Sequence, residues 1–399
     1  MSKTTFWENY RDILCLLLGI SLGTLLGVWA GPWLVWIKPI GAIFLNLLFC
    51  SVVPLVLVAL TSVIAQLEAG SGYLVRVTIL VFAGTTLMAA LFALGVVPFF
   101  PITDPIAALP ASTLPTILPF SEQMVQLVSV SDFYELLSRR NLLALLCFAI
   151  LLGTAVRQSG IAGEPFRKLL FSINEVLKRL LTLLMKAAPL GLGAFFADQI
   201  SSLGSQLFTQ YGQALLLGHG LCLAYYLLFL SLYAILGGGL RQLKTYWRYN
   251  LLPSATALGT CSSIATIPAN LQAAQFMGIP ASTAQVVIPL GASIHKEGSA
   301  ISAILKIVVA LSMVGLSLAD PVSIFLAILI SMLVSIVEGG IPNGGYVGQL
   351  LIVSVYQLPL EVLPVLMILG SLLDPVTTLL NATGDTAAGL LIQKLLLRK

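Results

Sequence analysis

The feature that most constrains this chain is a succession of long apolar runs that extends to residue 238. Because about 20 apolar residues in a helix cross the hydrocarbon core of a bilayer, each run predicts a membrane helix. Only 9% of the residues are charged, against roughly 25% in a soluble domain, which excludes a soluble enzyme. The net charge of +4 comes without a basic stripe, which excludes a nucleic-acid binder. The runs cover residues 13–36, 39–66, 77–100, 141–156, 169–197 and 211–238.

The distribution of basic residues predicts how the chain is oriented in the membrane. Residues 77–138 contain no Lys or Arg, whereas basic residues gather at both ends of the chain and after the run that ends at residue 238. By the positive-inside rule, both termini are expected in the cytoplasm and the proline-rich segment 101–133 outside. Glu8, Arg11 and Asp12 interrupt the first stretch, so we expect no cleaved signal peptide. The expected location is the plasma membrane, which is the cell inner membrane in a bacterium.

Two segments in the second half of the chain are apolar but broken at their centres. Segment 250–282 is interrupted by Gly-Thr-Cys-Ser-Ser at residues 259–263, and segment 320–358 by a glycine-rich stretch at residues 339–345. Each half is too short to cross a bilayer alone, so each segment predicts a helical hairpin that dips into the membrane. A helix with polar residues in its middle follows each hairpin, at residues 283–318 and 360–397. This repetition predicts an inverted repeat, which is typical of a secondary transporter.

Ionisable residues inside these two helices are the candidates for function, because a charge at membrane depth is costly. The first helix carries His295, Lys296 and Glu297. In the second, Asp374, Asn381 and Asp385 are seven and four residues apart, so they share one face together with Thr378. Such a polar stripe must face protein or water. No nucleophile–base pair accompanies it, so an enzyme is not expected.

The hairpin tips predict two kinds of ligand. Ser262 and Ser263 place hydroxyl groups near a helix N-terminus, which suits a carboxylate. Carbonyl oxygens beside Asn381 and Asp385 predict a site for a hard cation.

Four motifs in the second half of the chain resemble those of the dicarboxylate/amino acid:cation symporter family, which is the glutamate transporter family. They occur in the family's order, and shorter matches at residues 53–56 and 188–191 extend the resemblance over essentially the whole chain. The four motifs are Thr260–Pro268, Pro289–Ser299, Gly340–Gly345 and Asp374–Asp385.

The resemblance implies an all-α polytopic membrane protein with eight transmembrane helices and two re-entrant helical hairpins, organised as inverted repeats. It implies a homotrimer in which a transport domain moves like an elevator against a scaffold that forms the trimer contacts. Residues 1–76 then hold scaffold helices 1 and 2, and residues 77–100 hold helix 3 of the transport domain. Residues 101–208 hold the extracellular loop with scaffold helices 4 and 5, and residues 209–399 hold the rest of the transport domain.

The resemblance also assigns roles to residues. Ser263 and Asn381 are expected to meet the α-carboxylate of an amino acid, and Asp374 its α-ammonium, since an ammonium in a dry site needs a carboxylate partner. Gly344 and Gly345 are expected to be flexible points of a gate in the second hairpin. The substrate-binding residues implied are Ser262, Ser263, Ser299, Ile341, Pro342, Gly344, Asp374, Thr377, Thr378 and Asn381. The cation-coupling residues implied are Thr85, Thr86, Gly291, His295, Lys296, Glu297, Asn381 and Asp385.

One departure from the family pattern predicts the substrate. Members that carry acidic amino acids have an arginine at the position of Thr377, and neither Thr377 nor Cys261 can neutralise a second carboxylate. A small neutral amino acid such as alanine, serine, threonine or cysteine is therefore expected. An acidic amino acid or dicarboxylate stays open as an alternative, with Lys296 or His295 in place of the arginine.

A second departure concerns the coupling ion, which is Na⁺ or H⁺; no other cofactor is expected. The family's usual Asn-Met-Asp reads His295-Lys296-Glu297, and Phe82 replaces an expected tyrosine. If Na⁺ binds, Asn381 and Asp385 are its side-chain ligands. A fixed ammonium about 4 Å from a cation costs on the order of 4 kcal/mol at an effective dielectric of 20. We therefore predict that Lys296 acts as a tethered cation, paired with Glu297 or Asp385, and weakens or removes sodium dependence.

Other readings of the same motif stay open. His295 and Glu297 could titrate and couple transport to protons. Lys296 could instead point away from the site, with sodium still bound. At the level of the whole protein, the alternatives are an anion-conducting, channel-like protein and a paralogue that binds a solute without transporting it.

Overall fold

The structure is a computed structural model that describes residues 6–29, 34–65, 72–100, 125, 128–138, 141–203, 206–338 and 345–397. All regular structure in these residues is helical, so the all-α prediction is confirmed. Most of the predicted loop 101–133 and the tip of the second hairpin lie outside the described residues.

Three helices of the first half lie within five residues of the predicted apolar runs: α2, α3 and α6 match runs 39–66, 77–100 and 141–156. α1 differs, because it begins and ends seven residues before the predicted run 13–36. The helices of this half are α1 (Phe6–Trp29), α2 (Leu34–Ala65), α3 (Gly72–Val96) with the 3₁₀ turn η2 (Val97–Phe99), α5 (Phe133–Leu136), α6 (Leu142–Gln158), η5 (Gly160–Gly163), α7 (Glu164–Lys186) and α8 (Ala188–Leu203).

The predicted single helix over residues 169–197 is wrong, because the structure divides this segment into α7 and α8 at Ala187. Pro189 stands in the first turn of α8, where its missing N–H costs nothing, and its ring disfavours continuation of a helix that precedes it. Basic and acidic residues along α7 also make it strongly amphipathic rather than uniformly apolar.

The second half consists of shorter helices arranged around one long helix. α9 contains non-helical backbone at Gly238 and Gly239, which is where the predicted run 211–238 ends. The helices are α9 (Gln206–Tyr249), α10 (Leu251–Thr260), α11 (Ser263–Phe276), α12 (Ala281–Ile294), α13 (Glu297–Met313), α14 (Pro321–Val337), α15 (Gly345–Val355), η6 (Leu360–Val362) and α16 (Leu363–Leu397).

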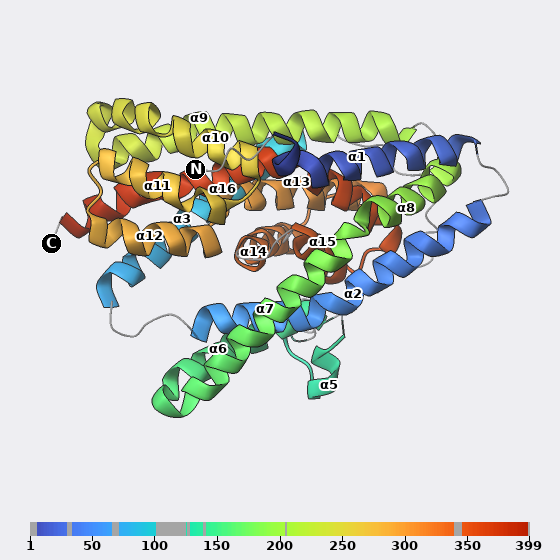
Figure 1. The fold of residues 1–399 in the computed structure, drawn as a ribbon, viewed down its shortest axis with the longest axis horizontal. Coiled ribbons are helices and arrows are strands. Elements are labelled where there is room, and N and C mark those ends of the chain that lie inside the picture. The colour runs from blue at the N-terminus through green and yellow to red at the C-terminus, as the bar shows by residue number, and fades with distance from the viewer. Residues whose placement is uncertain are drawn as a thin grey trace.

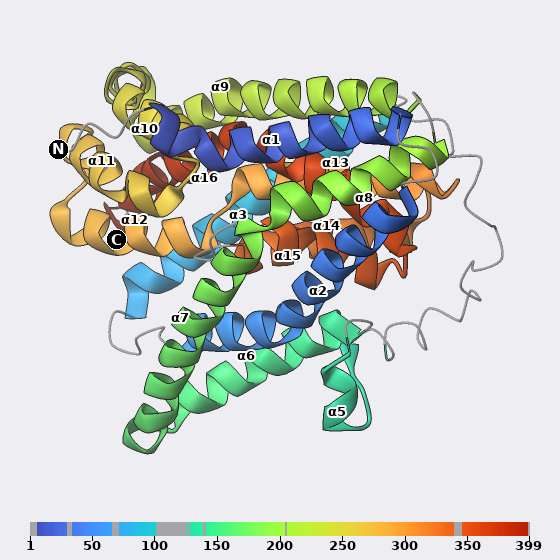
Figure 2. The same cartoon turned by 45° about the vertical axis from the view of Figure 1, so that its right-hand side comes forward.

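Two groups of helices can be followed in Figures 1 and 2. α16 lies among α3 and α9–α15, whereas α2, α6 and α7 form the lower part of both views. α1 and α2 both pack against α8, and α2 also packs against α6 and α7. Buried aliphatic side chains such as Ile304, Leu369 and Leu380 fill the space between α13 and α16. The long C-terminal helix therefore forms the centre of the group that carries the predicted site.

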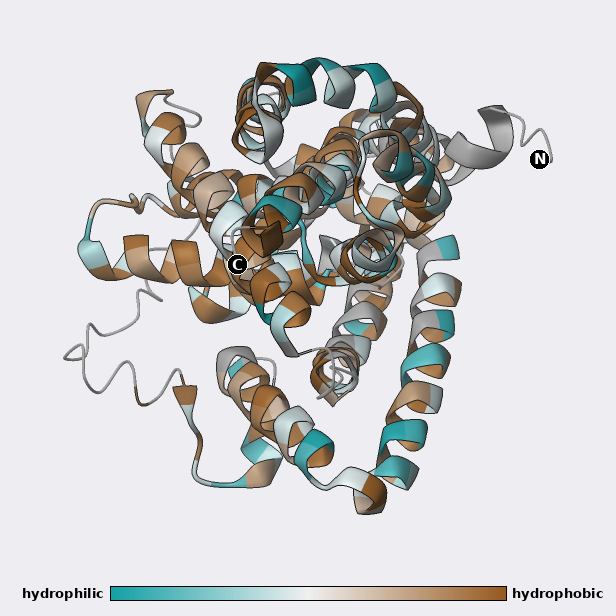
Figure 3. Cartoon of the chain, turned by 90° about the vertical axis from the view of Figure 1, so that its left-hand side faces the viewer, coloured by the Kyte–Doolittle hydropathy of each residue, from teal (hydrophilic) through white to brown (hydrophobic). Residues whose placement is uncertain are grey.

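Hydrophobic residues, brown in Figure 3, occur along most of the helices, and many large apolar side chains are exposed. Leu216 is 78% exposed and Leu228 is 62% exposed, both on α9. Large exposed apolar surface of this kind marks contact with lipid or with another protein. Within the described residues, three helices are long and apolar enough to cross a membrane: Tyr73–Phe99, Gly212–Tyr249 and Val365–Leu397.

Shorter apolar helices lie in α2, in α6 and in the predicted second hairpin, so they correspond to two other predicted crossings and to one half of that hairpin. They span Leu34–Phe44, Val53–Ser62, Ala144–Gln158 and Pro321–Val337. The fold is thus an all-helical membrane architecture, while the number of crossings stays a prediction.

The first predicted hairpin has its break at the predicted residues. α10 ends at Thr260, and Cys261 takes a left-handed conformation with φ 48°. Ser262 then caps α11, because its Oγ accepts the Ala265 N–H at 3.2 Å. The second segment also consists of two helices, α14 and α15. Asp320 caps α14 by accepting the Ser323 N–H at 2.9 Å, and this hydrogen bond lowers the pKa of its carboxyl.

Candidate functional site

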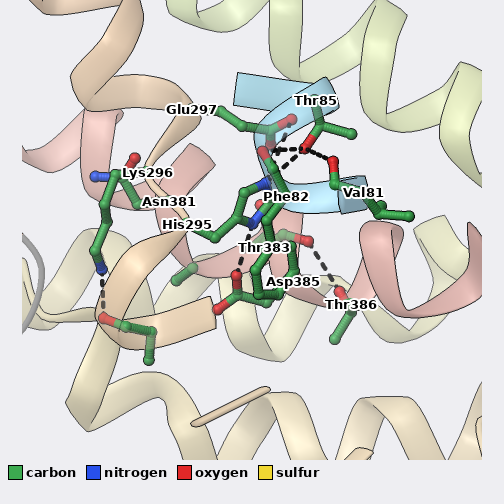
Figure 4. Close-up of polar contacts among 12 residues, drawn as sticks. Val81, Phe82, Thr85, His295, Lys296, Glu297, Asn381, Thr383, Asp385 and Thr386 are labelled. Atoms are coloured by element: carbon green, nitrogen blue, oxygen red, sulfur yellow. Dashed lines mark hydrogen bonds and ion pairs between the residues drawn. The ribbon is translucent and has the colours of Figure 1, made fainter. Parts of the chain in front are cut away.

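The predicted continuous helix over residues 283–318 is broken in the structure. α12 ends at Ile294, His295 has extended backbone, Lys296 is also non-helical with φ -135° and ψ 71°, and α13 begins at Glu297. Successive side chains point to opposite sides of an extended chain. The break therefore sends His295 and Lys296 in different directions, and Figure 4 shows them so.

His295 is the centre of a buried hydrogen-bonded cluster (Figure 4). Its Nδ1 lies 2.9 Å from Oδ1 of Asp385 on α16, and its Nε2 lies 2.8 Å from Oγ1 of Thr85 on α3. The ring stacks on Phe82 with centroids 4.3 Å apart and planes within 8°. All polar sites of the imidazole are thus used, and the side chain is fixed between α3 and α16.

Glu297 adds a second buried carboxylate to this cluster. Its Oε1 accepts a hydrogen bond from the hydroxyl of Tyr225 at 3.1 Å, and that hydroxyl also lies 2.7 Å from the hydroxyl of Tyr233. The same Oε1 is 3.9 Å from Nε2 of His295. The second carboxylate oxygens, Oε2 of Glu297 and Oδ2 of Asp385, have no hydrogen-bond partner in the described part of the chain. Two carboxylates therefore face one imidazole in a space that excludes solvent.

Close contact between α12 and α16 depends on Gly291. A Cβ atom added there would collide with the carboxylate of Asp385. The carbonyl of Gly291 accepts the N–H of His295 at 2.9 Å, so the same residue holds the end of α12. A larger side chain at this position would push Asp385 away from His295.

Asn381 caps the second half of the broken helix from across the interface. Its Oδ1 accepts the N–H groups of Gly298 at 2.9 Å and of Ser299 at 3.2 Å, and its Nδ2 donates to Oγ of Ser299 at 3.1 Å. Lys296, at the N-cap position of α13, has no acceptor in its side chain and makes no capping bond. Asn381 thus supplies the acceptor that free helix N-terminal N–H groups require.

The predicted pairing of Lys296 with Glu297 or Asp385 is wrong in this structure. Its Nζ donates to the carbonyl oxygen of Ala292 at 2.7 Å, and within the described chain it forms no ion pair with either carboxylate. Its backbone N–H donates to Oγ of Ser335 at 3.1 Å. The non-helical backbone at residues 295–296 explains the outcome, because it places the histidine rather than the lysine beside Asp385.

Of the remaining predicted coupling residues, Thr85 and Thr86 are both buried on α3. Thr85 contacts His295 directly, whereas no described polar contact joins Thr86 to the cluster.

The predicted substrate residues fall into three sets. On α16, Oγ1 of Thr378 donates to Oδ1 of Asp374 at 3.3 Å, and Oγ1 of Thr377 donates to the backbone carbonyl of Asp374 at 3.1 Å. Ser299 joins them through Asn381. Ser262 and Ser263 stand at the N-terminus of α11, where Ser262 acts as the cap. Ile341, Pro342 and Gly344 lie outside the described residues.

Sequence reasoning missed Lys306 on α13 and Tyr225 on α9. Lys306 is only 2% exposed, and its Nζ would lie 3.7 Å from a Cβ atom at Gly370, one turn before Asp374 on α16. A lysine inside an apolar stretch was a visible signal for a buried charge. Tyr225 carried no such signal, because a tyrosine in an apolar run is typical of ordinary packing.

A broken helix, a hairpin of two short helices and buried charges at their junction are features of secondary transporters, in which unwound backbone lines the site. The fold and site therefore define a membrane transporter. The family profile described as "Sodium:dicarboxylate symporter family" matches residues 13–395. The chain belongs to this family, so the expected class, a symporter and not an enzyme, is confirmed.

Individual relatives agree with this membership. The chain is 26% identical to "Serine/threonine transporter SstT" of Bifidobacterium adolescentis, over 94% of this chain and 87% of the relative. It is 27% identical to the protein of the same name from Enterococcus faecalis, over 93% and 88% of the two chains. It is 31% identical to "Neutral amino acid transporter B(0)" of Mus musculus, over 63% of this chain and 46% of that protein.

Proposed function

We propose that this protein is a symporter of small neutral amino acids such as alanine, serine, threonine and cysteine, coupled to Na⁺ or H⁺. The observation that carries the proposal is the environment of Asp374. Among the described residues, its carboxylate has only the hydroxyl of Thr378 as a hydrogen-bond partner, and the position expected to hold a cation in an acidic-substrate site is Thr377. Asp374 can pair with an α-ammonium, and the threonines suit a small side chain. The names of the relatives support the same substrate class.

The proposed mechanism is an elevator motion in a homotrimer in the plasma membrane, with both termini in the cytoplasm. The grouping of α3 with α9–α16, and of α1 and α2 with α6–α8, supports a division into transport domain and scaffold. The apolar outer surface supports contact with lipid and with neighbouring subunits.

A buried charge favours a second candidate, the acidic amino acids. His295 and Lys296 were the predicted substitutes for the missing arginine, but they bind Asp385 and the Ala292 carbonyl instead. Lys306 remains, because its ammonium is buried one turn from Asp374 and forms no ion pair with any described residue. It could neutralise a second carboxylate of a substrate.

The experiment that separates the two candidates is thermal stabilisation of the purified protein by a panel of amino acids. A ligand at 100 times its Kd adds about 2.7 kcal/mol, which is a measurable rise in Tm. We expect serine, alanine or threonine to stabilise the protein and aspartate or glutamate to have no effect. Stabilisation by aspartate that is lost in Lys306→Met would establish the acidic candidate instead. Uptake into proteoliposomes then distinguishes a transporter from a protein that only binds.

Replacing Asp374 with asparagine is expected to abolish amino acid binding. Removal of one partner of a buried ion pair costs about 3–5 kcal/mol, which is at least a hundredfold in Kd. The measurement is the serine-dependent shift in Tm, with the Tm of the ligand-free variant as its control. A variant that still binds serine within about tenfold of the wild-type Kd would show that the ammonium partner lies elsewhere.

A further inference from the structure

The position between α3 and α16 where the family resemblance led us to expect a coupling cation is filled by a side chain of this protein. The imidazole of His295 lies in hydrogen-bonding contact with Oγ1 of Thr85 and with Oδ1 of Asp385. It is 3.9 Å from Oε1 of Glu297. These oxygens are the hard ligands that a sodium ion would use. A ring N–H of His295 occupies the place of the ion beside the carboxylate of Asp385.

The other predicted sodium ligands are engaged as well. Both hydrogen bonds that Oδ1 of Asn381 accepts come from the N-terminus of α13, so its lone pairs are used. The carbonyl of Gly291 accepts the N–H of His295. A sodium ion bound by Asn381, Asp385 and Gly291 would therefore have to break the cap of α13 and displace the imidazole.

The ring is held in this place by more than its two hydrogen bonds. It stacks on Phe82, at the position where the family resemblance led us to expect a tyrosine. The side chain is 1% exposed, so no water can replace its contacts when it moves. Rotating His295 out would leave Asp385 with both carboxylate oxygens unpaired, since its Oδ2 already has no partner.

Charged and titratable groups face the ring from three helices. α16 contributes Asp385, α13 contributes Glu297, and α9 contributes Tyr225 and Tyr233, which are hydrogen-bonded to each other and, through Tyr225, to Glu297. Lys296 points away toward the Ala292 carbonyl. Among the described residues, only His295 provides an N–H group to the carboxylate of Asp385.

We propose that His295 is a built-in substitute for the coupling cation, so that sodium does not bind between α3, α12–α13 and α16 and amino acid binding is independent of sodium. The proposal rests on the proposed function, because its test measures amino acid binding. It identifies His295 as the residue that decides whether this site requires sodium. The role that we predicted for Lys296 as a tethered cation thus falls to the neighbouring His295.

Two measurements on the purified wild-type protein test the proposal. The first is equilibrium binding of ²²Na⁺ without amino acid, for which we expect no saturable binding. The second is the Kd for serine from thermal shifts in NaCl and in choline chloride. We expect the two values to agree within about twofold, whereas a coupled ion changes affinity roughly 5- to 150-fold.

A pair of variants makes the assignment specific to one residue. His295→Asn removes the ring and leaves an amide oxygen beside Asp385, so we expect ²²Na⁺ binding or sodium-dependent stabilisation to appear. The matched control is His219→Asn, which removes the other histidine of the chain. His219 lies on α9, and its one hydrogen bond among the described residues is to the Leu215 carbonyl, so this variant should resemble the wild type in both salts.

The outcomes separate this proposal from the proposed function. Saturable ²²Na⁺ binding by the wild type that disappears in Asp385→Asn would overturn the substitute role of His295. Stabilisation by serine only in NaCl would overturn it as well. If no amino acid stabilises the protein in either salt, the proposed function fails, while the ²²Na⁺ measurement still decides whether the cation site is filled. If His295→Asn does not fold, the two wild-type measurements decide alone.

Discussion

Replacing Gly298 with alanine is expected to disrupt the interface between α13 and α16 and to abolish transport. A Cβ atom at Gly298 would collide with the backbone of Thr377, including its carbonyl oxygen and Cα. Backbone atoms cannot rotate away as the end of a side chain can, so one of the two helices must shift. Overpacking in a core costs about 1–3 kcal/mol, and a collision with backbone belongs at the upper end or beyond it. The shift would also move Thr377 and the adjacent Asp374.

The measurement is Tm and serine uptake, compared with a matched glycine in another helix. Gly220→Ala in α9 adds a Cβ atom with no heavy atom within 4 Å. It should be neutral or stabilise α9, because alanine favours a helix by up to about 1 kcal/mol over glycine. If Gly298→Ala shows the Tm and uptake of Gly220→Ala, the close approach of α13 to α16 described here does not exist in the protein.

The parts of the fold that follow from local sequence signals could be predicted. Apolar runs gave the long helices, and the Gly-Thr-Cys-Ser-Ser stretch gave the break between α10 and α11. The end of the run at residue 238 matches the irregular backbone at Gly238 and Gly239. Each of these signals is a composition change or a residue with a known effect on helices.

The break inside residues 283–318 could not be predicted in the same way. Nothing in His295-Lys296 forbids a helix, and the interruption is stabilised by groups from elsewhere in the chain. Asn381 caps the second half, Ser335 accepts the N–H of Lys296, and Asp385 binds His295. The tertiary contacts override the local preference for a continuous apolar helix.

The break at His295 and Lys296 also explains why only part of the candidate site was predicted correctly. The spacing of polar residues in α16 predicted that Asn381 and Asp385 share one face. The structure confirms this, because both residues contact the junction of α12 and α13. Choosing between His295 and Lys296 required their side-chain directions. On a continuous helix neighbouring residues differ by about 100°, but in an extended segment they point to opposite sides. The sequence therefore indicated the cluster but not which of the two cationic side chains enters it.

Removing the side chain of Asn381 is expected to unfold the start of α13 and to lower the stability of the whole helix group. In Asn381→Ala, the N–H groups of Gly298 and Ser299 lose their shared acceptor in a buried site. An unsatisfied buried donor costs about 1–3 kcal/mol, so the two together cost on the order of 2 to 6 kcal/mol. Lys296 cannot replace the cap, because its side chain has only donors.

The control variant is Ser299→Ala, which removes the contact between Nδ2 of Asn381 and Oγ of Ser299 but keeps both capping bonds. It should lower Tm much less than Asn381→Ala, since only one hydrogen bond of about 1 kcal/mol is lost. Thermal unfolding without substrate measures this difference independently of any role of either residue in binding. Equal losses of Tm in the two variants would mean that Asn381 acts through Ser299 and that α13 begins without its cap from α16. A larger loss in Asn381→Ala would establish that α16 holds the broken helix open, and with it the position of His295 beside Asp385.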